Sequence, residues 1–220
     1  MKPVILFGIG RVAGLAHFYL THDTELEVAA FTVDRDYVAQ DTHLGLPVVA
    51  ADEVVARFPP DGYDMFVAVG YGRINSFREG KYRQAKAMGY DLISYVSSKA
   101  TVWPGTEIGD NCFIMENNVI QPFASIGNDV IMWGGSFVGH ESVIKDHCFV
   151  ASHVVISGLV TIEPNCFIGV NATIRDEITI ARECVLGAGV VVMKSTKERE
   201  VLVPQPARLL ALPSDRLPRI

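Results

Sequence analysis

The stretch IGDNCFIMENNVIQPFASI, residues 108–126, carries an isoleucine at every sixth position. The same spacing continues without interruption from Val96 to Val192, with an aliphatic residue at each position except for one methionine, Met132. A period of six fits neither the 3.6-residue turn of a helix nor the two-residue alternation of a long strand. It is typical of a solenoid of very short strands, in which three six-residue sides make one 18-residue coil.

Each of the four cysteines follows one of these aliphatic residues by four positions. Cys112, Cys148, Cys166 and Cys184 are separated by 36, 18 and 18 residues, which assigns them to one wall of the predicted prism. A free cysteine behaves as a small hydrophobic residue in such a core. No CxxC or mixed Cys/His spacing accompanies them, so we expect neither a metal site nor a disulfide.

Composition narrows the class of protein. The chain has 220 residues, of which 49% are hydrophobic and 20% charged, with a formal net charge of -6. These values are typical of a globular protein, and the negative charge argues against nucleic acid as a partner. Residues 1–16 resemble a signal peptide, but Arg11 interrupts the apolar run, and no later segment has the length of a membrane span. We expect a cytoplasmic protein with reduced cysteines and no membrane insertion.

The first 95 residues alternate between strand-like and helix-like patterns. Residues 3–8 form a buried-strand pattern that leads through Gly8 and Gly10 into a helix ending near Leu20. Glycines at such a turn let backbone N–H groups approach a phosphate, although a tight turn without a ligand explains the same pattern. Asp34 ends a second strand, where it can bind a ribose or a base. We expect a small parallel α/β sheet, about half of a dinucleotide-binding fold, with further elements at 51–57 (helix), 64–70 (strand), 75–88 (helix) and 91–96 (strand).

The outward-facing residues of the repeat, sorted into columns 18 positions apart, distinguish three faces. The first face is apolar and carries Phe113, Ile131, Phe149, Phe167 and Val185, flanked by Met115 and Trp133. The second face is also apolar and carries Val119, Phe137, Val155, Thr173 and Val191. The third is polar and carries Glu107, Ser125, Val143, Thr161 and Thr179. Exposed apolar faces favour self-association. If the first face of one subunit contacts the second face of the next, a ring closes, and we predict a homotrimer.

His140 and Glu141 occupy a corner where other repeats have Gly, Asn, Asp or Pro. This corner joins the second face to the third, so a trimer places it at an intersubunit cleft. Gly158 follows 18 residues later, one rung of about 4.8 Å above His140. A histidine base beside a backbone N–H suits acyl transfer, because the imidazole takes a proton from the attacking group and the N–H stabilises the oxyanion. Glu141 can orient the imidazole. A polar corner residue without a catalytic role is the alternative for His140.

His147 and His153 take a corner slot that elsewhere holds asparagine or aspartate. The slot favours a left-handed backbone conformation, which His and Asn tolerate, so structure alone can explain both histidines. By its column, His153 lies between the two apolar faces and points toward a threefold axis. His147 lies at the corner that faces a neighbour's His140, and we predict a substrate-binding role for it. The other occupants of the slot are Asn111, Asn117, Asp129, Asn165 and Asn171.

The isoleucine-rich hexapeptide repeat, the α/β unit before it and the His-Glu pair in mid-repeat resemble bacterial nucleotide-sugar N-acyltransferases, the group of the bacillosamine-pathway and sialic-acid acetyltransferases. The resemblance covers nearly the whole chain. It implies a left-handed parallel β-helix, an exception to the usual right-handed crossover. It also implies acetyl transfer from acetyl-CoA to the amino group of a nucleotide-linked amino sugar, in polysaccharide biosynthesis. The expected domains are a nucleotide-sugar-binding α/β domain at 1–95, the β-helix at 96–194 and a capping tail at 195–220.

The resemblance implies roles for individual residues. His140 matches the general base, Glu141 its partner and Gly158 the amide that contacts the thioester carbonyl. The acyl-CoA is expected along an intersubunit groove, beside Gly187, Ala188, Gly189 and Arg208. The nucleotide sugar is expected to contact Gly8, Gly10, Arg11, Asp34, Gly70 and Asn75, with Trp133 and His147 on the acceptor side of the cleft. No metal is implied.

Three departures from the family pattern leave the acceptor sugar open. Arg11 and Val12 stand where the family often has a histidine, Trp133 and Phe149 replace polar residues, and Pro204 replaces a glycine. O-acetylation of a sugar and a non-catalytic trimeric ligand-binding solenoid are the alternatives. A metal-dependent carbonic-anhydrase-like solenoid is disfavoured, because the three histidines of the repeat lie on three different corners. The first domain is too short for a nicotinamide dehydrogenase.

Overall fold

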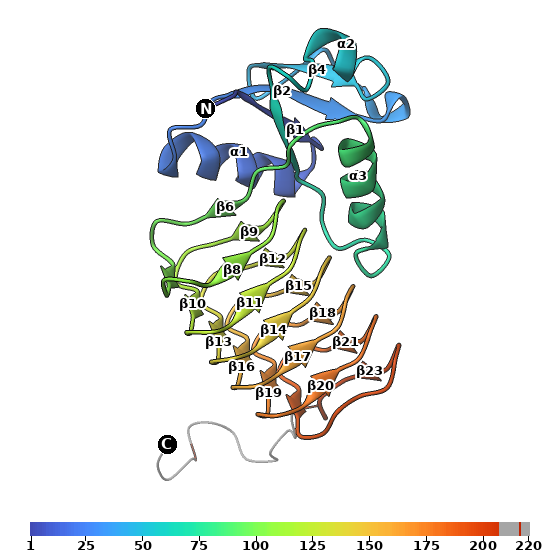
Figure 1. Cartoon of the computed structure of the whole chain (residues 1–220). Helices are drawn as coiled ribbons and strands as arrows, with labels where there is room; N and C mark the ends of the chain where they lie inside the picture. Colours follow the sequence, from blue (N-terminus) through green and yellow to red (C-terminus); the bar gives the residue numbers. More distant parts are fainter. Residues whose placement is uncertain (207–215, 217–220) are drawn as a thin grey trace.

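A computed structural model describes residues 1–206 and Arg216 of the chain. An α/β domain lies over the first coils of a three-sided β-helix, whose later coils extend away from it (Figure 1). Within the described residues, no helix is both long and apolar enough to cross a membrane.

The α/β domain is built on a five-stranded sheet in the order β3-β4-β2-β1-β5, in which only β3 is antiparallel to its neighbour. Helix α1 packs on one face of the sheet, and α2 and α3 pack on the other. The carboxyl ends of the parallel strands β1, β2 and β5 therefore meet at one edge. The elements are β1 (Val4–Phe7), α1 (Arg11–Asp23), β2 (Val28–Val33), a short 3₁₀ helix (Arg35–Tyr37), β3 (Thr42–His43), β4 (Leu46–Ala50), α2 (Val54–Arg57), β5 (Asp64–Val67) and α3 (Ser76–Ala87).

Two elements of this domain differ from the predicted pattern. Strands β3 and β4 form a short hairpin around Gly45, whose φ is 80°, and no prediction covers them. The predicted strand at 91–96 contributes only one bridge to the sheet, from Leu92 to Met65. Its later part turns into the β-helix, where Ser94 Oγ donates to the carbonyl of Gly109 at 2.7 Å and accepts the N–H of Cys112 at 2.8 Å. That the domain is half of a dinucleotide-binding fold stays a prediction.

The β-helix consists of three sheets of two-residue parallel strands, and successive strands pass from one sheet to the next. The first-face sheet contains β6 (Tyr95–Val96), β9 (Phe113–Ile114), β12 (Ile131–Met132), β15 (Phe149–Val150), β18 (Phe167–Ile168), β21 (Val185–Leu186) and β23 (Val201–Leu202). The second-face sheet contains β7 (Thr101–Val102), β10 (Val119–Ile120), β13 (Phe137–Val138), β16 (Val155–Ile156), β19 (Thr173–Ile174) and β22 (Val191–Val192). The third-face sheet contains β8 (Glu107–Ile108), β11 (Ser125–Ile126), β14 (Val143–Ile144), β17 (Thr161–Ile162) and β20 (Thr179–Ile180). Strands up to β22 pair with a register of 18 residues, for example Val119 with Phe137, and β23 pairs with β21 at 16, as in Val185 with Val201. The arrangement fits a left-handed β-helix.

The residues of the six-residue period fill the interior of the β-helix, as predicted. From Ile114 to Val192 each of them is at most 3% exposed. Val96, Val102 and Ile108 are less buried, with Val96 at 37% exposure, because they lie in the first coil, where no earlier coil covers them. All four cysteines are free and buried. Burial raises the pKa of the Cys112 thiol to about 12, which keeps it protonated near neutral pH.

The two apolar faces of the β-helix are not equally open. Phe113, Ile131 and Phe149 on the first face are at most 3% exposed, because the α/β domain packs on them. The prediction that the whole first face awaits a neighbouring subunit is therefore wrong for the early coils. The second face stays open, with Val155 at 41% and Val191 at 61% exposure.

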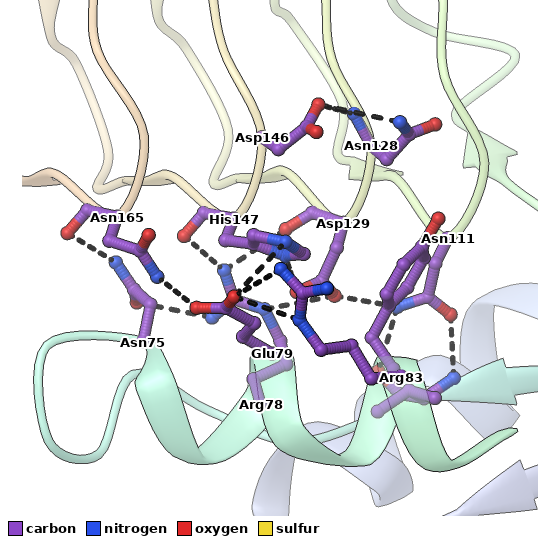
Figure 2. Close-up of polar contacts among 12 residues, drawn as sticks. Asn75, Arg78, Glu79, Arg83, Asn111, Asn128, Asp129, Asp146, His147 and Asn165 are labelled. Atoms are coloured by element: carbon purple, nitrogen blue, oxygen red, sulfur yellow. Dashed lines mark hydrogen bonds and ion pairs between the residues drawn. The ribbon is translucent and has the colours of Figure 1, made fainter. Parts of the chain in front are cut away.

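The corner slot adopts the left-handed backbone that the sequence predicts, with φ between 54° and 62° at all seven positions. Four of these residues, Asn111, Asp129, His147 and Asn165, form a column 18 residues apart that faces α3 (Figure 2). Asn111 also bonds to the backbone of Val67 at the end of β5. The column therefore joins the β-helix to the α/β domain.

Arg78 on α3 is the centre of this junction (Figure 2). Its side chain and that of Asp129 are both 0% exposed, and its Nε lies 3.1 Å from Asp129 Oδ1. Its Nη2 donates to the carbonyls of Asp129, His147 and Cys148 at 2.9–3.2 Å. Asp129 additionally accepts the side-chain amide of Asn111 at 2.7 Å. The buried charges are thus paired and hydrogen-bonded, as burial requires.

Replacing Arg78 with alanine is expected to lower the free energy of unfolding by about 3–5 kcal/mol, because it leaves the Asp129 carboxylate buried without its ion-pair partner. Arg83→Ala on the same helix is the matched control. Arg83 is 70% exposed and pairs with Glu79, so its loss costs about 1 kcal/mol or less. Urea unfolding at one protein concentration measures both, and equal midpoints for the two variants would contradict the expectation.

Candidate active site

A cavity of about 460 Å³ lies at the carboxyl edge of the α/β sheet. Five residues predicted to contact a nucleotide sugar line it together: Gly8, Gly10, Arg11, Asp34 and Gly70. The remaining lining comes from the ends of β1, β2 and β5, the start of α1, the 3₁₀ helix and the first half of α3: Phe7, Ile9, Val12, Val33, Tyr37, Ala68, Val69, Phe77 and Lys81. The structure therefore brings residues from both sides of the sheet to one site.

The glycine loop is suited to an anion at the start of α1. Gly8 has a φ of 129°, and a Cβ there would lie 2.7 Å from the carbonyl oxygen of Ala68, so only glycine fits. The N–H of Gly14 makes the first intrahelical bond, to the carbonyl of Gly10 at 3.0 Å. The preceding N–H groups of the first turn have no intrahelical acceptor and can bind a phosphate.

Asp34 forms an ion pair with Lys81 that the sequence does not predict. The ammonium of Lys81 lies 2.6 Å from its carboxylate and also 5.4 and 5.5 Å from the ring centroids of Phe7 and Phe77. Phe77 and Lys81 are four residues apart at the start of α3, hence on one helix face. The helix that carries them follows β5, which ends at the same sheet edge as β1 and β2. This order and the four-residue spacing could have identified Phe77 and Lys81 as cavity residues.

His140 and Glu141 lie at the corner between the second and third faces. His140 Nδ1 lies 3.1 Å from Glu141 Oε2, and the imidazole side chain is 56% exposed. A carboxylate accepts hydrogen bonds and donates none, so Nδ1 donates to Glu141, and Nε2 is the ring nitrogen that remains open to a substrate. The backbone is fixed as well, since the N–H of His140 donates to Gln121 Oε1 at 2.9 Å. The pair has the arrangement of a general base and its orienting carboxylate.

Gly158 lies directly against the imidazole of His140. A Cβ at this position would be 2.7 Å from His140 Nε2, so only glycine leaves room for the ring. The carbonyl of Gly158 accepts the N–H of Glu177 at 3.1 Å, whereas its own N–H has no hydrogen-bond partner in the part of the chain that the structure describes. A free N–H donor thus accompanies a free imidazole nitrogen, which suits stabilisation of an oxyanion beside a base.

Two residues predicted to bind substrate, His147 and Asn75, lie in the domain junction. His147 is 6% exposed, and its Nδ1 lies 2.8 Å from Asp129 Oδ2. Asn75 is fully buried and donates to the carbonyls of Asn165 and Cys166 at 3.3 and 3.0 Å. Helix α3 docks onto this column and encloses the two side chains, and their substrate-binding role stays a prediction (Figure 2).

Trp133 lines a second cavity, of about 270 Å³, between α1 and the corner that joins the first two faces. Its indole Nε1 is buried and lacks a hydrogen-bond partner within the described residues. Glu116 in the same cavity accepts the hydroxyl of Tyr19 at 2.7 Å. The substrate-binding role of Trp133 stays a prediction.

The residues predicted to contact acyl-CoA lie at a different corner from His140. Gly187, Ala188 and Gly189 follow β21, so they belong to the corner between the first and second faces, and Ala188 and Gly189 are exposed. Arg208 lies outside the described residues. One chain therefore does not bring the predicted CoA residues and the His140 corner together.

The repeat matches a known family. Residues 93–202, which are 110 of the 220, match the family model described as the GMPPB C-terminal domain. The chain belongs to this family. The match covers the β-helix, and the α/β domain precedes it.

Solved structures of other proteins resemble this chain over both of its domains. One is a perosamine N-acetyltransferase from Caulobacter crescentus, solved as a variant with one histidine replaced by asparagine, in complex with CoA and GDP-perosamine. It is 25% identical to this chain with a TM-score of 0.84, and the match covers 94% of this chain and 96% of that one. PerB from the same organism, with the same ligands, is 26% identical with a TM-score of 0.81, covering 91% and 93%. The acetyltransferase domain of PglB from Neisseria gonorrhoeae FA1090 is 23% identical with a TM-score of 0.81, covering 96% and 100%, and shows the fold. The predicted resemblance to nucleotide-sugar acetyltransferases of the hexapeptide-repeat family is confirmed.

The three histidines of the β-helix lie at three different corners, as the repeat pattern predicts. His140 follows β13, His147 follows β14 and His153 follows β15. The ring of His153 covers Gly135, where a Cβ would lie 2.6 Å from it. Across the described residues, no three His, Cys, Asp or Glu side chains gather as a metal-binding group.

Replacing Gly158 with alanine is expected to displace the imidazole of His140, because the added methyl would lie 2.7 Å from Nε2. The Cε1–H resonance of His140 in a proton–carbon NMR spectrum measures this displacement. Gly80→Ala on α3 is the control, since nothing lies within 4 Å of its added methyl. An unshifted His140 signal in Gly158→Ala would show that the ring does not rest on this backbone.

Proposed function

We propose that the protein transfers an acetyl group from acetyl-CoA to the amino group of a nucleotide-linked amino sugar. The observation that carries the proposal is the His140 corner, where Glu141 bonds to Nδ1 and Nε2 lies against Gly158, whose N–H has no hydrogen-bond partner within the described residues. Support for the two substrates comes from the structural relatives, which are described in complex with CoA and GDP-perosamine. The cavity at the sheet edge, with its anion-binding loop, supports a nucleotide in the α/β domain.

In the proposed reaction, His140 Nε2 accepts a proton as the sugar amine forms its bond to the thioester carbonyl carbon. The N–H of Gly158 donates to the carbonyl oxygen as that oxygen gains negative charge. The carbon–sulfur bond then breaks, and the imidazolium returns its proton to the leaving thiolate. Glu141 stabilises the imidazolium through Nδ1. The attack is direct, because the four cysteines are buried inside the β-helix and offer no nucleophile.

We further infer that the functional unit is a homotrimer in which each site uses two copies of the chain. The His140 corner and the Gly187–Gly189 corner lie on different edges of one β-helix, and the open second face offers an apolar surface for contact. A ring of three prisms brings two such edges of neighbouring copies together. Cytoplasmic location and a role in polysaccharide biosynthesis stay predictions of the resemblance.

Replacing His140 with alanine is expected to lower the turnover number by about 10²–10⁴, the usual contribution of a general base. CoA release from acetyl-CoA and a panel of amino-sugar nucleotides measures the rate, with the corresponding hydroxy-sugar nucleotides testing O-acetylation. His22→Ala, which removes an exposed histidine of α1, is the control and should keep the wild-type rate. If His140→Ala keeps that rate, or if no amino sugar is a substrate, the proposed function is wrong.

Introducing a charge on the second face is expected to break the trimer. Val155→Glu places a carboxylate at an apolar position that is 41% exposed in the single chain, and burying it in an interface is costly. Sedimentation velocity should show a trimer for the wild type, a monomer for Val155→Glu and a trimer for Thr161→Glu, the matched substitution on the third face. A monomeric wild type with full acetyl transfer would refute the shared site.

A further inference from the structure

The cavity of the α/β domain places one ion pair beside several apolar side chains, and Arg11 and Tyr37 are its other polar lining residues. Phe7, Val33, Val69 and Phe77 line it beside the Asp34–Lys81 ion pair. The side chains of Lys81 and Asp34 are 15% and 33% exposed, so both are partly buried yet open to a ligand. A nucleobase has apolar faces and a polar edge, whereas a ribose carries hydroxyl groups around its ring. The recess matches the base better than the sugar.

The ion pair has unused hydrogen-bonding capacity on both partners. Lys81 has three ammonium hydrogens, and its partners in the described part of the chain are the Asp34 carboxylate and Gln84 Oε1 at 3.0 Å. The Asp34 carboxylate has about four acceptor sites, and the ammonium does not occupy all of them. One donor and one acceptor can therefore act on the same ligand edge.

We propose that Asp34 and Lys81 select a keto nucleobase. The Lys81 ammonium donates to the exocyclic carbonyl oxygen, and the Asp34 carboxylate accepts the adjacent ring N–H. Guanine, hypoxanthine, uracil and thymine present this carbonyl and N–H side by side, whereas adenine and cytosine present an amino group beside an unprotonated ring nitrogen. An amino base would therefore place its amino hydrogens toward Lys81 and its ring nitrogen toward the Asp34 carboxylate, and both contacts are repulsive.

The position of the pair agrees with this assignment. The first-turn N–H groups of α1 are available for the diphosphate, and Asp34 ends the neighbouring strand, one strand spacing of about 4.8 Å away. Lys81 reaches the cavity from α3, on the face of the sheet opposite α1. The ligand's diphosphate and base are thus held at two ends of one cavity. The inference rests on the proposed function in taking a nucleotide as the occupant.

Two pairs of nucleoside diphosphates test whether the site recognises the carbonyl and ring N–H edge of the base. Inosine and adenosine diphosphates differ only in this edge, as do uridine and cytidine diphosphates. Isothermal titration of the full chain, without acetyl-CoA, is expected to give at least about tenfold tighter binding for the keto member of each pair. Equal binding within both pairs overturns the proposal and indicates that Asp34 contacts the ribose.

Variants assign the selectivity to the pair. Lys81→Met and Asp34→Ala are each expected to remove the preference, and Lys81→Arg, which keeps a cationic donor, is expected to retain it. Lys145→Met is the matched control, since Lys145 pairs with Glu163 at 2.7 Å on the β-helix, away from the cavity. Thermal unfolding verifies that each variant is folded. A preference that survives in folded Lys81→Met overturns the proposal.

CoA release with an amino-sugar nucleotide separates this inference from the proposed function. Keto selectivity without any acetyl transfer leaves the base assignment standing and refutes the function. Acetyl transfer by a protein that binds none of the four diphosphates refutes the base assignment and leaves the function standing.

Discussion

The buried pair of Arg78 and Asp129 determines how the two domains sit on one another. Both side chains are fully buried, so the pair is stable only with its polar atoms satisfied, and three backbone carbonyls together with Asn111 complete the set. In the column of corner residues that faces α3, the neighbours of Asp129 in the coils before and after it are Asn111 and His147, and neither side chain is an anion. Sliding α3 by one coil would leave Arg78 buried without a carboxylate, and the junction therefore has one register.

The register of α3 also supports a strained turn between the cavity and the β-helix. Arg73, Ile74 and Asn75 have consecutive positive φ values of 54°, 50° and 63°. A left-handed conformation costs roughly 1–2 kcal/mol per residue for side chains other than glycine. The Asn75 side chain offsets this cost through its bonds to two β-helix carbonyls. The turn carries Tyr71 onto Phe149 and Phe167, with ring centroids 4.8 and 5.1 Å apart, so the rim of the cavity continues onto the first face.

Properties that depend on neighbouring residues along the chain were predictable from the sequence, and those that depend on docking were not. The buried period of six, the cysteine wall and the left-handed corners each follow from a local pattern. The His140 corner was predictable for the same reason, since Glu141 is adjacent and Gly158 is one coil away. His147 has the same local pattern as His153, yet α3, some 70 residues earlier, encloses it, as Arg78 bonding to its carbonyl shows. Lys81 was missed because its partner Asp34 is 47 residues away.

The predicted acetyl-CoA residues and the His140 corner lie on different edges of the β-helix, so the proposed trimer combines them from two copies of the chain. The aliphatic core separates the His140 corner from the Gly187–Gly189 corner, and no side-chain rotation crosses it. The α/β domain covers the first face at Phe113, Ile131 and Phe149 but leaves Phe167 and Val185 further along only half-buried. In the proposed trimer, the first face is therefore most open to a neighbour along the later coils. These are the coils that carry Gly187, so the surface available for contact and the predicted donor residues coincide at one end of the β-helix.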